Sequence, residues 1–435
     1  MTTARRSSLL AVVLALALPA PPAAARTELG ASAAEADVTV GCMFPMTGRS
    51  GIYGRDSVGG IRVALQRLAA QHGKRAAPRI RVLVEDSASK VSYAVRIAED
   101  FTRRDHARFL CGVVSSGVGQ AVSRFAAEHD VIFVGTDHAS SRLTIEQLHR
   151  RYFRVSNDTY ASMAAGARYL AELQGRTGWR RVAFIGADYD YGHVSLEDLR
   201  TNLDSLGVKY EIAGEFWPKL YEPDYSPYIR ALQAARPDVV VAALWGGDFI
   251  AFLKQAAATD FLDRIRLANF DTGGNYDVMV ALGSTPPAGL ILSARHHNNW
   301  PDTPLNRWFV SSFHALEGRF PTYAAEGAYS GIMAIAAAVE KAGGARSTDR
   351  LVQALEGLVL ELPEDPPGYR SRIDPETHQI AQAQAVGEVV PDDRFPPAQV
   401  MLGKWVVYPA EILQPTPDVI QRRRAAAKRR AHRVE

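Results

Sequence analysis

Two serines stand between an apolar run and a helical pattern in the first third of the chain. Ser115 and Ser116 follow the run 109–114, and Gly117 precedes apolar residues at helical spacing. Free backbone N–H groups, two hydroxyls and the helix dipole at such a point favour an anion such as a carboxylate. Serine is also a preferred helix cap, so a plain N-cap is the alternative interpretation.

A second polar loop carries Asp137, His138, Ala139 and Ser140 after the run 131–134. Ligands of open α/β sheets bind beyond the carboxyl ends of the strands, so these residues are expected to face the same cleft as the two serines. By itself, His138 is better interpreted as a surface-loop histidine, and only its position after the strand makes a ligand contact an equal alternative.

Three later residues follow apolar runs in the same way, namely Tyr191, Trp245 and Asp271. An aspartate that faces a cleft can pair with a ligand ammonium through a charge-assisted hydrogen bond. For Tyr191, packing over a helix start is the alternative. Tyr53 and Tyr329 are weaker candidates for the cleft.

The sequence lacks the common catalytic motifs, because it has no G-x-S-x-G, H-E-x-x-H or P-loop pattern. The Gly-Val-Gly of residues 117–119 resembles a dinucleotide fingerprint, but Val122 stands at the third glycine position. His296 and His297 lack spaced partners for zinc. We therefore expect no metal, no cofactor and no catalysis.

Strand-like and helix-like patterns alternate along the chain. Short β-branched runs predict parallel strands, and apolar residues at helical spacing between them predict covering helices. Strands are expected at 38–43, 80–84, 109–114 and 131–134 in a first unit, and at 181–185, 210–216, 239–244, 265–270 and 290–293 in a second. Helices at 305–316, 324–341 and 348–358 and strands at 386–390 and 404–407 are expected to follow. The pattern predicts an α/β protein with two doubly wound units.

The composition is that of a soluble globular protein, with 47% apolar and 22% charged residues among 435. Of the net charge of +3, residues 1–25 carry +2 and residues 421–435 carry +6, which leaves −5 for residues 26–420. A mildly acidic body gives no support for nucleic-acid binding. We interpret the basic segment 413–435 as a solvated C-terminal tail, with contact to an anionic membrane surface as the alternative.

The N-terminus has the pattern of a secretory signal peptide. Arg5 and Arg6 precede a short apolar run at 9–18 and an A-x-A-like cleavage site at 23–25. We expect residues 1–25 to be removed, residues 26–37 to form a spacer, and the mature protein to be exported.

The two cysteines, Cys42 and Cys111, fall on the first and third expected strands, which are neighbours in a doubly wound order. An oxidising compartment would permit a disulfide. Neighbouring parallel strands rarely give favourable disulfide geometry, so of the two interpretations we favour two buried thiols.

Several short segments occur in an order that resembles a known family. They are the residues FPMTG at 44–48 with Tyr53-Gly54, SSG at 115–117, the stretch 139–144, DYDYG at 188–192, FLKQA at 252–256, GAY at 327–329 and the stretch 374–379. Together they are similar to the leucine/isoleucine/valine-binding protein family, the type I periplasmic solute-binding proteins of ABC importers. The match runs in order from about residue 38 to about residue 410.

The resemblance implies a type I periplasmic binding protein fold, with two doubly wound parallel-sheet lobes joined by three crossover strands. It implies that residues 38–154 and 296–358 form lobe 1, and that residues 155–295 and 359–412 form lobe 2. It also implies a monomeric periplasmic receptor that closes on an amino acid, such as a branched-chain one, or a related small carboxylate or amide. The receptor would then deliver this ligand to the permease of an ABC transporter.

The resemblance further implies that Tyr191 contacts the ligand, that Trp245 forms an aromatic wall and that Asp271 lies near an acidic position of the family. His138 and Ala139 depart from the family, because alanine and threonine are typical there. This departure favours an aromatic-acid or urea/amide receptor as the alternative. Two further functions are compatible with the same fold, namely a ligand-sensing partner of a signalling system and an exported enzyme.

Overall fold

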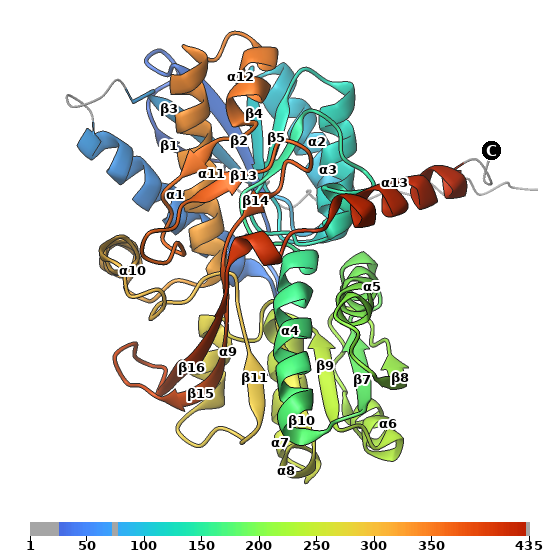
Figure 1. Cartoon of the computed structure of the whole chain (residues 1–435). Helices are drawn as coiled ribbons and strands as arrows, with labels where there is room; N and C mark the ends of the chain where they lie inside the picture. The colour runs from blue at the N-terminus through green and yellow to red at the C-terminus, as the bar shows by residue number, and fades with distance from the viewer. Residues whose placement is uncertain (1–25, 72–76, 432–435) are drawn as a thin grey trace, which may run out of the picture.

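The computed structural model describes residues 26–71 and 77–431 and consists of two lobes, one above the other in Figure 1. Each lobe has a central sheet with helices on both faces, which confirms the predicted α/β class. The expected signal peptide, residues 1–25, lies outside the described residues.

Lobe 1, the upper one in Figure 1, is built on a six-stranded sheet in the order β1-β3-β2-β4-β5-β6. Strands β2 to β6 are parallel, and β1 pairs antiparallel with β3. The strands are β1 (Thr27–Gly30), β2 (Val38–Phe44), β3 (Ile80–Asp86), β4 (Phe109–Gly112), β5 (Ile132–Gly135) and β6 (Tyr152–Arg154). The helices are α1 (Gly51–Gln71), α2 (Val91–Arg103), α3 (Ser116–Glu128), α10 (Pro304–Glu317), α11 (Tyr323–Ala342) and α12 (Thr348–Leu355).

Lobe 2 is built on a seven-stranded sheet in the order β16-β15-β11-β10-β9-β7-β8. Strands β7 to β11 are parallel, and β15 and β16 extend the sheet in the antiparallel sense. The strands are β7 (Arg181–Gly186), β8 (Glu211–Phe216), β9 (Val239–Ala243), β10 (Arg266–Asn269), β11 (Leu290–Leu292), β15 (Gln384–Pro391) and β16 (Val400–Tyr408). The helices are α4 (Thr159–Thr177), α5 (Asp190–Ser205), α6 (Ser226–Ala235), α7 (Gly246–Ala257), α8 (Phe261–Arg264) and α9 (Tyr276–Leu282).

Within the described residues, the chain passes between the lobes three times, at residues 155–158, 293–303 and 382–383. A doubly wound sheet in each lobe with three connections is the predicted fold. His296 and His297 lie on the second connection.

One expected lobe boundary is wrong. Residues 359–381, expected in lobe 2, form a small antiparallel sheet of β12 (Val359–Leu360), β13 (Ser371–Ile373) and β14 (Ile380–Ala381). Leu360, Ile373 and Ile380 are buried in the lobe 1 core. The segment therefore belongs to lobe 1, because its apolar side chains pack there.

The sheet of lobe 1 buries side chains on both faces, as a parallel sheet with helices on both sides must. Val40, Cys42 and Phe44 of β2 lie in the core cluster that includes residues of α1 and α11. Met43, one residue out of phase, lies in the cluster with α2 and α3. This two-residue period explains why the strands read as continuous apolar runs.

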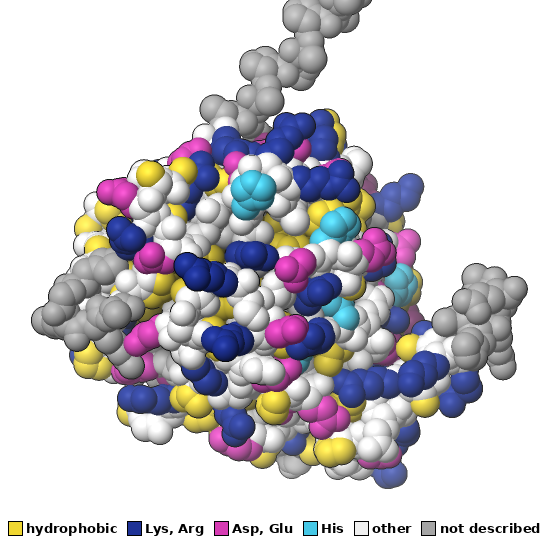
Figure 2. Space-filling model, turned by 90° about the horizontal axis from the view of Figure 1, so that it is seen from above, with side chains coloured by type: hydrophobic (Ala, Val, Ile, Leu, Met, Phe, Trp, Pro, Cys, Tyr) yellow, Lys and Arg dark blue, Asp and Glu magenta, His cyan; other side chains and the backbone are white. Residues whose placement is uncertain are grey.

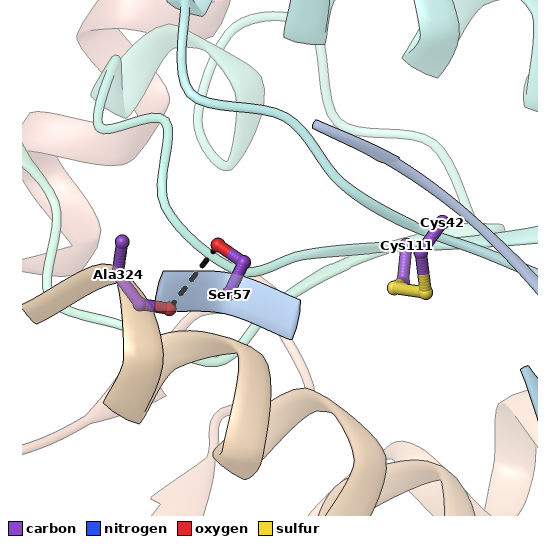
Figure 3. Close-up of a disulfide and its surroundings, with 4 residues drawn as sticks. All are labelled: Cys42, Ser57, Cys111 and Ala324. Carbon is purple, nitrogen blue, oxygen red and sulfur yellow. Dashed lines mark hydrogen bonds between the residues drawn. A yellow bond between two sulfur atoms is a disulfide. The ribbon is translucent and has the colours of Figure 1, made fainter. Parts of the chain in front are cut away.

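The cysteines form a disulfide, so the prediction of two thiols is wrong. Cys42 of β2 and Cys111 of β4 are register partners on the same sheet face, with their Cα atoms 4.4 Å apart. Figure 3 shows the bond joining the two strands beside α1 and α11. These two helices approach closely, because the Ser57 hydroxyl of α1 donates to the Ala324 carbonyl of α11 over 3.4 Å. A Cβ on Gly60 of α1 would lie only 1.9 Å from the backbone oxygen of Ala325.

The basic C-terminal segment is not the solvated tail that we expected. Its residues up to Ala431 include helix α13 (Pro417–Ala431), which lies at the junction of the lobes and projects from it in Figure 1. Arg423 is only 8% exposed and pairs with Asp198 of lobe 2 over 2.7 Å and with Glu146 of lobe 1 over 2.9 Å. The buried Asp198 and the partly buried Glu146 hold the helix on the body.

The expected spacer at residues 26–37 also contains structure, because β1 pairs with β3 at the sheet edge. Seen from above in Figure 2, lobe 1 carries Lys and Arg side chains interspersed with Asp and Glu rather than gathered into one basic patch. In the part of the chain that the structure describes, no helix has the length and apolar character needed to cross a membrane.

Candidate functional site

The strand ends of the two lobes meet where lobe 1 faces lobe 2, and side chains from both lobes are in contact there. The Tyr53 hydroxyl of α1 donates to Asp277 Oδ2 of α9 over 2.7 Å. The Tyr53 ring lies 5.8 Å from that of Trp245 and 5.6 Å from that of Tyr323. Tyr53 therefore links the two lobes through these contacts.

The expected anion site lies at the N-terminus of α3. Ser115 is the N-cap residue, but its side chain makes no capping hydrogen bond. The plain N-cap interpretation therefore does not describe this serine. Ser116 is buried, and its hydroxyl accepts a hydrogen bond from the Ser140 backbone N–H over 3.2 Å. The structure thus joins the two polar loops.

Ser140 has a buried hydroxyl that makes no hydrogen bond within the protein. A buried hydroxyl without a partner costs about 1–3 kcal/mol, which a ligand atom could offset. Together with the uncapped helix start, Ser140 forms an arrangement suited to a carboxylate.

Arg154 positions this loop, although the sequence analysis did not single it out. The side chain is 0% exposed and lies at the end of β6. It donates to the carbonyls of Ala139 and Ser140 over 3.2 and 2.9 Å and to the Tyr152 hydroxyl over 3.0 Å. Ala139 thus contributes a carbonyl to the support of the loop, and its small side chain offers no hydroxyl.

His138 is buried, so its interpretation as a surface-loop histidine is wrong. Its ring is buried and bonds to the Tyr152 hydroxyl over 2.8 Å and to the Val113 carbonyl over 3.2 Å. It stacks on Phe133 inside lobe 1. Burial and the nearby Arg154 guanidinium lower the pKa of His138 well below its ordinary value, which keeps the ring neutral.

Asp271, expected to meet a ligand ammonium, already has four protein donors. Its Oδ1 accepts from the Ser162 hydroxyl over 2.9 Å and from Arg295 Nε over 3.0 Å. Its Oδ2 accepts from the Tyr191 hydroxyl over 2.9 Å and from Arg295 Nη2 over 2.7 Å. Burial opposes ionisation, but the Arg295 guanidinium and these hydrogen bonds outweigh it and lower the pKa of Asp271.

Arg295 is the principal residue that the sequence analysis missed. It lies just after β11, on the second connection between the lobes, and is 7% exposed. Its Nη1 lies 3.0 Å from Asp137 Oδ1, and its guanidinium lies 4.7 Å from the centre of the Tyr323 ring. The guanidinium thus joins Asp271 of lobe 2 to Asp137 of lobe 1. Its position after a strand was the signal that could have identified it.

Aromatic rings line the rest of the contact region. Trp245 Nε1 donates to the Tyr189 hydroxyl over 2.9 Å, and the Tyr189 ring lies 6.0 Å from that of Tyr191. Tyr329, the second weaker candidate, is not part of this wall. It is fully buried in the lobe 1 core, with its ring 5.1 Å from Phe309.

No group of three or more potential metal ligands occurs among the residues with described positions. His296 bonds instead to the Asn306 side chain over 2.8 Å, and burial lowers the pKa of His296 to about 4.

The paired lobes, their three connections and the polar strand ends between them are the architecture of a two-lobed binding protein. The chain belongs to the periplasmic binding protein family, whose sequence model matches residues 37–394. It is 24% identical over 376 residues to Leu/Ile/Val-binding protein homolog 6 of Brucella melitensis, covering 84% of this chain and 91% of that protein.

Solved structures of solute-binding proteins have the same fold. One is a solute-binding protein of an ABC transporter from Rhodopseudomonas palustris in complex with 3,4-dihydroxybenzoic acid, with a TM-score of 0.74, 23% identity and coverage of 86% of this chain and 97% of that one. Another is an amino acid ABC transporter substrate-binding protein from Pseudomonas fluorescens, with a TM-score of 0.73, 24% identity and coverage of 88% and 96%.

Proposed function

We propose that this protein is an exported receptor that captures a small carboxylate between its lobes and delivers it to the permease of an ABC transporter. The carrying observation is the buried Ser140 hydroxyl, which lacks a protein partner beside the uncapped start of α3. Capture follows from hinge closure, because a ligand that contacts both lobes binds the closed state better than the open one. Export to the periplasm rests on the signal pattern of residues 1–25 and on the family.

The carboxylate end of the ligand is assigned to lobe 1. Ser115 and Ser116 stand at the first turn of α3, and Ser140 lies beside them through its backbone bond to Ser116. Backbone N–H groups at a helix start and serine hydroxyls are donors, and a carboxylate is the small organic anion that accepts several of them at once.

The body of the ligand is assigned to the aromatic walls. Tyr53, Tyr323 and Trp245 are buried at the interface of the lobes and offer ring surface rather than charge. Such walls suit a planar or branched apolar group. The complex of the Rhodopseudomonas palustris protein with 3,4-dihydroxybenzoic acid makes aromatic acids the first class to test.

Amino acids are the second candidate class. The Brucella melitensis relative is named a Leu/Ile/Val-binding protein homolog, and Asp137 Oδ2 is buried without a partner. That oxygen is one place where a ligand ammonium could be received.

A sensor that binds a solute but transports nothing would use the same cleft. A neighbouring histidine kinase gene in place of permease and ATPase genes would favour this alternative function.

A thermal-shift screen of the mature chain tests the proposal, after unfolding and refolding to remove carried ligand. The panel holds benzoate, 4-hydroxybenzoate, leucine, phenylalanine, acetamide and urea. A ligand at about 100 times its Kd adds about 2.7 kcal/mol, which raises the Tm by about 5–11 °C for a lobe-sized domain. A rise with carboxylates is expected. A rise with acetamide or urea alone, or with none of the panel, would contradict a carboxylate receptor.

Two serine variants locate the site. Ser140→Ala removes a hydrogen bond to a charged group and is expected to weaken carboxylate binding about tenfold or more. Ser311→Ala is the matched control, because Ser311 is exposed on α10 and bonds only to its own helix. Equal affinity of both variants would remove Ser140 from the site.

A further inference from the structure

We infer that Arg295 is a specificity-determining residue that makes the cleft reject solutes with an α-ammonium group in favour of carboxylates without one. This inference rests on the proposed carboxylate function and concerns the opposite end of the same ligand. It follows from where the guanidinium lies and from which acceptors it uses.

Asp271 has no acceptor site to spare. An ionised carboxylate offers about four lone-pair positions. Ser162, Tyr191 and two nitrogens of Arg295 supply four donors, two to each oxygen, at 2.7 to 3.0 Å. A ligand ammonium can therefore reach Asp271 only by displacing a donor that the protein supplies.

Arg295 is held from three sides. It makes a two-point contact with Asp271, a 3.0 Å contact with Asp137 Oδ1 and a ring contact with Tyr323 at 4.7 Å. The Arg295 side chain is 5% exposed, and those of Asp137 and Asp271 are 1% and 0% exposed. Displacing the guanidinium would leave two buried carboxyl groups without their cation, so the Arg295 position persists when ligand enters.

The charge of Arg295 also opposes a second cation in this cluster. An ammonium placed at Asp137 Oδ2, the one open carboxyl oxygen in this cluster, would share that carboxyl with the guanidinium bonded to Oδ1. Two cations on one carboxyl group repel at low dielectric. In addition, burial raises the pKa of Asp137 to about 7, which weakens it as a partner for a cation. A carboxylate without an ammonium meets no such penalty.

Matched ligand pairs test this inference on the full mature chain. Isothermal titration compares leucine with 4-methylpentanoate, phenylalanine with 3-phenylpropanoate, and phenylglycine with phenylacetate, pairs that differ only in the ammonium. We expect each deaminated acid to bind at least about tenfold tighter, since like charges at close contact are strongly unfavourable. Equal or tighter binding of the amino acids would overturn this inference and leave the carboxylate receptor intact. Binding of none of the six would overturn both.

A variant pair assigns the discrimination to Arg295. Arg295→Gln frees two acceptor positions of Asp271, so the preference for the deaminated acid is expected to shrink at least about tenfold. Arg150→Gln is the control, because Arg150 pairs with Asp349 at an exposed site over 2.7 Å. An unchanged preference in a folded Arg295→Gln protein would overturn the assignment. If that variant does not fold, the affinity ratios of the matched ligand pairs in the unmodified chain still test whether the cleft rejects the ammonium group.

Discussion

Replacing Asp271 with alanine should destabilise the protein severely, because the carboxylate is the shared acceptor of a buried network. The substitution leaves the Arg295 guanidinium, the Tyr191 hydroxyl and the Ser162 hydroxyl without the acceptor that they now share. Removing one partner of a buried ion pair costs about 3–5 kcal/mol. For a lobe of about 150–250 residues, each kcal/mol lowers the Tm by about 2–4 °C, which gives a fall of about 6–20 °C.

Differential scanning calorimetry at neutral pH measures this loss, with Asp349→Ala as the matched control. Asp349 also pairs with an arginine, but both side chains are exposed at 57% and 69%. Such a surface pair contributes about 0–1 kcal/mol. A fall in Tm for Asp271→Ala no larger than that for Asp349→Ala would refute the buried network.

The same pair has a defined pH dependence. The pKa of Asp271 is lowered in the folded protein, because the Arg295 guanidinium and the hydrogen bonds outweigh the burial that opposes ionisation. The carboxylate therefore contributes its stability at pH values above its unfolded pKa, and that contribution is lost as the pH falls through its folded pKa. The difference in unfolding free energy between the unmodified chain and Asp271→Ala should shrink in acid.

Three further predictions concern features outside the cleft. The Cys42–Cys111 bond closes a separation of 69 residues, so the double serine variant should lose about 4 kcal/mol of unfolding free energy in urea titrations. Denatured, unreduced protein should show no free thiol, and two free thiols would contradict the bond. Burial raises the pKa of Glu326 from an ordinary 4.5 to about 7. Between these two pH values the folded state retains a proton that the unfolded state releases, so the free energy of unfolding falls as the pH rises. Glu326→Gln should therefore stabilise the protein more at pH 8 than at pH 5 in urea titrations, and equal gains would contradict the shift. Arg423→Ala should cost about 3–5 kcal/mol and expose α13 to trypsin, and unchanged digestion would contradict its anchoring.

Much of the fold could be predicted from local pattern. The expected strand at 239–244 corresponds to β9, and the expected helix at 324–341 corresponds to α11, because a buried parallel strand is an apolar run and a buried helix has a 3.6-residue period. Segment 359–381 was misplaced because its short strands carry no sign of the lobe on which they pack. That choice is made by contacts with residues far away in the chain.

The sequence pattern selects candidate site residues but not the residues that they contact. The strand-end rule selected Asp271, but its partner Arg295 lies on the second connection, and spacing could not pair the two residues. The burial of His138 could not be predicted, because it depends on two hydrogen-bond partners inside lobe 1. These are the Tyr152 hydroxyl and the Val113 carbonyl. Arg423 could not be distinguished from the other basic residues of its segment. Its two acidic partners lie more than two hundred residues earlier, so no local pattern indicates the pairing.

A crystal structure of the mature chain with a bound aromatic monocarboxylate tests the central claim most directly. The account predicts that the ligand lies between the lobes, with its carboxylate on the Ser140 hydroxyl and the first turn of α3. Its ring should lie against Tyr53, Tyr323 or Trp245, and the Arg295–Asp271 pair should be unchanged. A ligand carboxylate bound elsewhere in the cleft, or a Ser140 hydroxyl still without a partner in the complex, would contradict it.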